Sequence, residues 1–169
     1  GDPEFYKMFA SVPSVEPIYA SLKAMKKHNI HVEVTNLVIP KIGDSMDRIR
    51  ELAKWIFENL GKDTPFHLLR FNPNYKLDNI SSTEIKTLEE AHNAASEQGL
   101  DFVYLGNVPG HRYENTYCPG CREMLIRRYG FDVARWNITD DMRCPNCGRQ
   151  IAIKGKFYRQ GFSLPYSLI

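Results

Sequence analysis

The stretch HVEVTNLVIP, residues 31–40, decides the fold class of this 169-residue chain. Its apolar residues alternate with polar ones at the two-residue period of a β-strand. One face carries Val32, Val34 and Val38. The other face begins with His31, Glu33 and Thr35. A buried carboxylate without a partner is costly, so this polar face needs partners, which a barrel lumen or a ligand crevice would supply.

Helices and strands are expected to alternate on both sides of this strand through residue 111. Ser14 is a candidate helix cap, Gly43-Asp44-Ser45 is the expected start of a second helix, and Ser81–Glu84 has the spacing of a capping box. The expected helices start at these three positions and end near Met25, Gly61 and Gly99, and the expected strands cover residues 31–39, 66–71 and 102–105. Repeated αβ units of this length predict parallel strands joined by right-handed crossovers.

Composition excludes several classes of protein. The chain is 43% hydrophobic and 25% charged, which is typical of a globular domain and excludes wholesale disorder. No apolar run approaches the roughly 20 residues of a membrane span, and no signal peptide is recognisable. We therefore expect a cytoplasmic protein. The net charge of +2 is too small to imply a nucleic-acid or membrane partner by itself.

All four cysteines lie within thirty residues, as two Cys-x-x-Cys pairs: Cys118 with Cys121, and Cys144 with Cys147. Two such pairs at this separation are typical of a structural zinc site with four thiolate ligands, and iron accepts the same shell. Disulfides would need an oxidising compartment, and a redox pair explains only one of the two motifs. We expect Gly148 to take the left-handed conformation that ends the second turn. Four protein ligands leave no open position for catalysis.

Charge divides the chain unevenly. Residues 112–160 hold ten Lys and Arg against five Asp and Glu, whereas residues 1–111 hold twelve against fifteen. A basic zinc ribbon can contact nucleic acid, so a stand-alone zinc-ribbon α/β module that binds nucleic acid or a protein partner is an alternative function. Solvent exposure is the simpler expectation for Arg122, Arg127, Arg128 and Arg135, and for His28 and His92 on the helices.

Residues 31–40, followed by Gly43-Asp44-Ser45, resemble the later strands of radical SAM enzymes. The likeness is to the AmmeMemoRadiSam-system group, often labelled pyruvate formate-lyase activating enzyme-like. Further stretches agree in order, and together they cover roughly residues 6–153. These stretches are Pro65-Phe-His67 through Phe71-Asn-Pro73, then Tyr104-Leu-Gly-Asn107, and Asn115-Thr-Tyr-Cys118-Pro-Gly-Cys121.

The resemblance implies a partial (β/α) barrel that binds S-adenosylmethionine, with a [4Fe–4S] cluster that cleaves it reductively. By the same resemblance, His67 lies near S-adenosylmethionine, and Glu33, Thr35 and Asn107 line the same cavity. The chain departs from the family pattern because it has no Cys-x-x-x-Cys-x-x-Cys triplet to hold the cluster. We therefore assign no catalytic residue and expect this chain alone not to cleave S-adenosylmethionine.

These inferences divide the chain into four parts. Residues 1–5 have the composition of a cloning remnant, 6–112 form the partial barrel, 113–156 the zinc ribbon and 157–169 a tail. The chain is expected to be the C-terminal portion of a longer enzyme rather than a natural stand-alone remnant. Its expected partners are the missing N-terminal half, a protein substrate and, through exposed strand edges, a second copy of itself.

Overall fold

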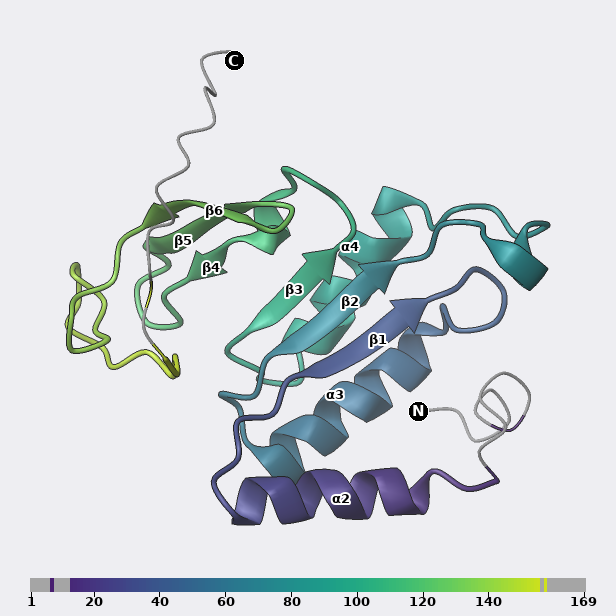
Figure 1. Cartoon of the computed structure of the whole chain (residues 1–169), viewed down its shortest axis with the longest axis horizontal. Coiled ribbons are helices and arrows are strands. Elements are labelled where there is room, and N and C mark those ends of the chain that lie inside the picture. The colour runs from purple at the N-terminus through teal and green to yellow at the C-terminus, as the bar shows by residue number, and fades with distance from the viewer. Residues whose placement is uncertain (1–6, 8–12, 156, 158–169) are drawn as a thin grey trace.

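The computed structural model describes residues 7, 13–155 and 157, and shows a mixed α/β structure with two three-stranded sheets (Figure 1). The expected cloning remnant at residues 1–5 and the tail from residue 158 onward lie outside the described residues. No described helix has the length and apolar character that crossing a membrane requires.

The first sheet is parallel, as the alternation of elements predicts. Its strands β1 (Val34–Val38), β2 (Phe66–Arg70) and β3 (Val103–Gly106) lie in that order. Helix α3 (Met46–Leu60) connects β1 to β2, and α4 (Ile85–Ser96) connects β2 to β3. The short 3-10 helices η1 (Tyr75–Leu77) and η2 (Arg112–Glu114) lie in the loops that follow β2 and β3. The register aligns Thr35, His67 and Tyr104 across the three strands.

The described helices cover one face of this sheet only. Side chains of α3 and α4 form one core with the even-numbered face of β1 and β2, and that core includes Ile49, Ile56, Leu88, Val38, Phe66 and Leu68. Helix α2 (Glu16–Lys27) lies outside this layer against α3, where the rings of Tyr19 and Trp55 have centroids 4.3 Å apart. No helix within residues 13–155 covers the odd-numbered face, which carries Glu33 and His67; we call this the helix-free face.

The helix caps follow the sequence at one helix and depart from it at two. Ser45 caps α3 by accepting a hydrogen bond from the backbone N–H of Arg48 at 3.5 Å, and Gly61 ends that helix with a φ of 97°. Helix α2 has Val15 at its N-cap position without a side-chain cap, and the expected cap Ser14, one residue earlier, accepts a hydrogen bond from the N–H of Glu16 at 3.3 Å. The expected capping box at Ser81–Glu84 is also wrong, because Glu84 itself occupies the N-cap position and makes no capping bond.

Thr83, which lies within the expected capping box, makes tertiary hydrogen bonds instead of capping the helix. Its side chain is fully buried and donates a hydrogen bond to the carbonyl of Val38 at 2.6 Å, while it accepts one from the N–H of Phe71 at 2.9 Å. The carbonyl of Thr83 accepts a hydrogen bond from Nε of Arg70. One threonine therefore ties the carboxyl ends of β1 and β2 together, where no further ladder bond can do so.

The second sheet is antiparallel and contains β4 (Thr116–Tyr117), β5 (Met124–Tyr129) and β6 (Asp132–Trp136). We call residues 113–155, which hold this sheet and the four cysteines, the cysteine lobe. Figure 1 shows the lobe beyond β3. Its hydrophobic core includes Leu125, Ile126 and Ile151 together with Phe102, which precedes β3 on the helix-free face. The lobe thus packs on part of the face that the helices leave free.

The expectation of solvent exposure holds for His28 and is wrong for His92. His92 is 9% exposed on the inner side of α4, and its ring stacks on Tyr113 with centroids 3.6 Å apart. Burial lowers the pKa of His92 to about 4, so this imidazole is neutral in the folded protein.

We expect Thr83→Val to lower the free energy of unfolding by about 2–4 kcal/mol, because it leaves the buried carbonyl of Val38 and the N–H of Phe71 unpaired. Thr83→Ser retains the hydroxyl and should lose less than half as much. Urea unfolding of the two variants beside the wild type measures the difference. A Thr83→Val variant as stable as the wild type would show that the two hydrogen bonds do not stabilise this corner.

We also expect His92 to make the protein less stable in acid. Its folded pKa lies below its unfolded value, so the unfolded chain binds the proton and stability falls as the pH drops from 6.5 toward 4. Once the pH is well below 4, the free energy of unfolding is lower by about 3 kcal/mol. His92→Phe, which keeps the stack on Tyr113, should flatten this part of the stability–pH curve. His28→Phe on the exposed end of α2 is the matched control, and a His92→Phe curve that parallels the wild type would contradict the assignment.

Candidate metal centre and adjoining cavity

The four cysteine sulfurs converge on one point. All four Sγ atoms lie within 4.8 Å of one another, with 3.5 Å between Cys118 and Cys147 and 3.6 Å between Cys121 and Cys144. A tetrahedral shell with metal–sulfur bonds of ~2.3 Å has sulfurs about 3.8 Å apart, so the spacing fits a four-thiolate metal site. The two Cys-x-x-Cys pairs thus form one group that can hold a metal ion.

The two cysteine turns share one backbone plan. In the first, the N–H of Cys118 bonds to the carbonyl of Glu123, and the N–H of Arg122 bonds to the carbonyl of Cys118. In the second, Cys144 bonds in the same way to Arg149 and accepts from Gly148. Arg122 has a φ of 64° and Gly148 a φ of 73°, so both turns end in the left-handed conformation. The sequence indicates this for the glycine but not for the arginine.

The thiols compete for negative charge. A hydrogen bond from the backbone N–H of Glu123 lowers the pKa of Cys121 to about 6. The backbone N–H of Arg149 favours the thiolate of Cys147, but the neighbouring sulfurs of Cys121 and Cys118 outweigh it and raise the pKa of Cys147 to about 12. Four thiolates at these distances therefore need a cation between them, because like charges this close disfavour full ionisation.

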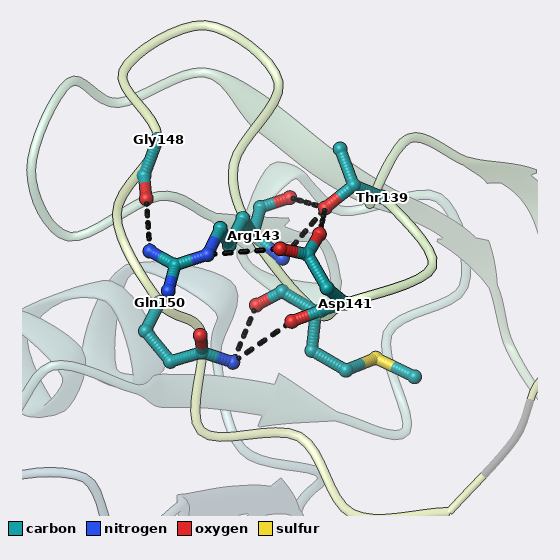
Figure 2. Close-up of polar contacts among 6 residues, drawn as sticks. Thr139, Asp141, Arg143, Gly148 and Gln150 are labelled. Atoms are coloured by element: carbon teal, nitrogen blue, oxygen red, sulfur yellow. Dashed lines mark hydrogen bonds and ion pairs between the residues drawn. The ribbon is translucent and has the colours of Figure 1, made fainter.

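A polar network braces the second turn (Figure 2). Thr139 Oγ1 accepts from the N–H of Arg143 at 2.8 Å, and the Arg143 guanidinium bonds to Asp141 at 2.9 Å and to the carbonyl of Gly148 at 3.0 Å. Gln150 donates to the carbonyl of Asp141 at 3.1 Å. The segments before and after the cysteine pair are thus held together by side chains, independently of the sulfurs.

A cavity of about 760 Å³ lies between the helix-free face of the parallel sheet and the cysteine lobe. The sheet contributes Glu33, His67, Tyr104 and Gly106, and the lobe contributes Thr116, Ile126, Arg128 and Trp136. Gly106 leaves room for the side chain of Leu69 at the cavity floor, because a Cβ on residue 106 would lie 2.3 Å from Cδ2 of Leu69. Phe102 lines the cavity and also belongs to the hydrophobic core around the cysteines, so the cavity borders that core.

Glu33 and His67 are brought into contact across β1 and β2. Nε2 of His67 lies 2.7 Å from one carboxylate oxygen of Glu33, and Nε2 of His31 lies 2.9 Å from the other. Partial burial of Glu33 works against its ionisation, but the hydrogen bonds from His31 and His67 prevail and hold its pKa below the usual value. A carboxylate bridging two imidazoles is therefore the polar centre of the cavity floor.

The polar row continues toward the cysteine lobe. The ring of Tyr104 stacks beside His67 with centroids 5.2 Å apart, and its hydroxyl lies 2.9 Å from Thr116 Oγ1. Arg128 donates to the same Thr116 oxygen at 2.8 Å and to the carbonyl of Glu114 at 3.0 Å. Burial raises the pKa of Tyr104, so its hydroxyl stays protonated and can donate.

The other two expected cavity residues lie farther from this centre. Asn107, with a φ of 61°, is at the carboxyl end of β3, borders the cavity and donates to the carbonyl of Arg70 at 3.0 Å. Thr35 points to the same face of the sheet and is exposed, but it is not among the residues that line the cavity.

Two cavity residues escaped the sequence analysis. Tyr104 lies two residues after Phe102 and therefore on the same face of the strand, so it could have been predicted once that face was known to be the helix-free one. Arg128 was expected in solvent and is instead half-buried against Glu114 and Thr116, whereas Arg122, Arg127 and Arg135 are exposed as expected. A β-bulge between Arg127 and Arg128 interrupts the alternation from which its side would have been inferred.

We expect Cys144→Ser to abolish tight metal binding and the stability that depends on it. A metal held at a thousandfold excess over its dissociation constant stabilises the fold by about 4 kcal/mol, so a chelator should lower the Tm of the wild type and leave that of Cys144→Ser unchanged. Asp140→Ser, an exposed non-ligand in the same loop, should behave as the wild type. Metal analysis with a visible spectrum measures occupancy and separates colourless zinc from iron. Stoichiometric metal in Cys144→Ser would contradict the site.

Comparison with known proteins finds a similar archaeal sequence. No protein-family model matches the sequence. A protein of Methanocaldococcus jannaschii that is named only as uncharacterized is 44% identical to this chain over 154 residues, which are 90% of this chain and 46% of that protein. The chain thus spans about half the length of the curated relative it matches.

Proposed function

We propose that the chain is the C-terminal portion of a radical SAM protein of the AmmeMemoRadiSam-system, pyruvate formate-lyase activating enzyme-like family. In this proposal it contributes part of the S-adenosylmethionine and substrate cavity and a structural zinc ribbon. The observation that carries the proposal is the helix-free face of the parallel sheet, which directs Glu33 and His67 into a cavity of about 760 Å³. In a partial (β/α) barrel, that face is the lumen.

The strand arrangement supports a barrel segment. Three consecutive strands lie in sequence order with their connecting helices on one face, as successive βα units of a barrel do. Within the described residues, β1 pairs only with β2, so its outer edge is open to a preceding strand. A relative about twice as long as this chain provides room for such strands. In the chain alone, the same edge favours pairing with a second copy.

The cysteine lobe supports the zinc ribbon. Its four sulfurs fit a tetrahedral shell, and all four positions come from protein, which suits a structural role. The group that cleaves S-adenosylmethionine in the family is a [4Fe–4S] cluster, which supplies the electron for reductive cleavage. All four cysteines of this chain belong to the one group, so ligands for that cluster would come from another part of the longer protein.

The residues of this chain would bind and orient the ligand. Glu33 accepts from both neighbouring imidazoles and thereby fixes the ring plane of His67 at the cavity floor. Tyr104 closes off the other side of that ring. The apolar wall, which includes Phe102, Ile126 and Trp136, excludes water from this part of the cavity.

We expect this chain to bind S-adenosylmethionine weakly, since it holds only part of the cavity, and to lose at least fivefold in affinity on His67→Ala. Thr35→Ala is the matched control, because it changes the same face outside the cavity lining and should leave the affinity unchanged. Isothermal titration with the ligand measures both.

Cleavage provides a separate check on the same protein. After iron–sulfur reconstitution and reduction, the chain should form no 5′-deoxyadenosine, because it has no cluster ligands beyond the ribbon. Undiminished binding in His67→Ala would contradict the assigned cavity. Formation of 5′-deoxyadenosine would contradict the proposal that the cluster ligands come from another part of the longer protein.

A further inference from the structure

The outermost strand of the cysteine lobe is exposed on both faces over its first four residues, whereas its last residue, Trp136, stacks on Phe157 with ring centroids 4.8 Å apart. In β6, residues 132–135 are all exposed, whereas a strand that belongs to a packed sheet normally buries every second residue. Within the described part of the chain β6 pairs only with β5, so its outer edge offers free backbone N–H and C=O groups. We call this strand and its outer edge the β6 edge. Such an edge is a ready template for another strand.

Two arginines face each other across β5 and β6, one on the edge strand and one on the strand beside it. Arg127 of β5 and Arg135 of β6 are direct cross-strand partners, and both are exposed. Among the described residues neither guanidinium has an acidic side chain in ion-pair distance. Like charges directly opposite one another destabilise a strand pair. The pair therefore lowers the stability of the hairpin and is suited to an anionic partner.

The hairpin turn adds apolar surface. Phe131 is fully exposed at 105%, and Val133 on β6 is 37% exposed. Gly130, Phe131 and Trp136 also line the large cavity, so the turn stands at the border of that space. On the other side, the ring of Tyr129 lies against Gly110, where an added Cβ would meet the ring at 3.2 Å. The turn is thus supported by the loop after β3 while Phe131 remains uncovered.

We propose that the β6 edge is a docking site for an extended, acidic polypeptide segment, which adds to the sheet as a fourth strand. Its backbone would pair with β6, its carboxylates would neutralise Arg127 and Arg135, and an apolar side chain would cover Phe131. The free ladder groups favour a polypeptide over a nucleic acid or a lipid surface, because only another backbone offers both donors and acceptors at the spacing of a strand. The proposal goes beyond the radical SAM assignment and does not rest on it.

The probe is a fluorescein-labelled peptide of four Glu-Val repeats, followed by fluorescence anisotropy with the whole chain in its metal-bound form. We expect saturable binding that weakens as salt is added. The same peptide with alternate backbone nitrogens methylated keeps its charge and loses its donors, and should bind at least tenfold more weakly. A peptide of four Lys-Val repeats should not bind. Amide hydrogen exchange in β6 should slow when the acidic peptide is present.

Arg135→Glu is the decisive variant. It places opposite charges across the hairpin, so its Tm should equal or exceed that of the wild type while peptide affinity falls at least tenfold. Lys54→Glu on α3, which makes the same change in net charge away from the lobe, should leave the affinity unchanged.

Four results would overturn the proposal. The first is absence of binding up to ~1 mM peptide. Equal binding of the methylated peptide would show charge attraction without strand addition. Tighter binding of a twelve-nucleotide oligo-dT would assign the surface to nucleic acid. A dimer that Arg135→Glu dissociates would assign the edge to a second copy. Each readout is independent of S-adenosylmethionine, so failure here leaves the cavity assignment standing, and the reverse also holds.

Discussion

A parallel sheet must bury both of its faces, and that constraint organises this molecule. Both crossovers are right-handed and step along the sheet in the same direction, from β1 to β2 to β3. The connecting helices α3 and α4 therefore lie on the same face and can cover only that one. The second face is covered by the cysteine lobe, and only over β3, where Phe102 enters the lobe's core. The cavity is the space between the lobe and the sheet that the lobe does not fill. The polar residues of the helix-free face lie in this space, where they are only partly buried. The polar row from Glu33 to Arg128 is tolerable there because every member has a hydrogen-bond or ring partner.

The alternation of elements and the buried face of the first strand could be predicted from the sequence, because both follow from local periodicity. Ser45 and Gly61 bound α3 as expected, since the groups they satisfy belong to their own helix. The capping box at Ser81–Glu84 failed for a non-local reason. Thr83 bonds to Val38 in β1 and to Phe71 directly after β2, which lie 45 and 12 residues away in sequence, and these buried bonds outweigh a solvent-exposed cap.

The meeting of the four cysteines could be predicted from their spacing alone, whereas the cavity could be predicted only in part. Two cysteine pairs define their own geometry, because each turn is local and the sulfurs have one place to meet. The contact between Glu33 and His67 depends on the register of β1 against β2, which no single strand encodes. Arg128 and His92 were misplaced because their partners come from η2 and the lobe, elements whose position against the parallel sheet is set by tertiary packing.

Phe102 is shared between the core around the cysteines and the wall of the cavity. A ligand that ordered this wall would act on the same side chain as an ion that tightened the shell around the sulfurs. Thermodynamic linkage makes this relation reciprocal, so the factor by which a metal changes the affinity for a cavity ligand equals the factor by which that ligand changes the affinity for the metal. A site with no vacant coordination position can in this way influence binding in a neighbouring cavity without touching what is bound there.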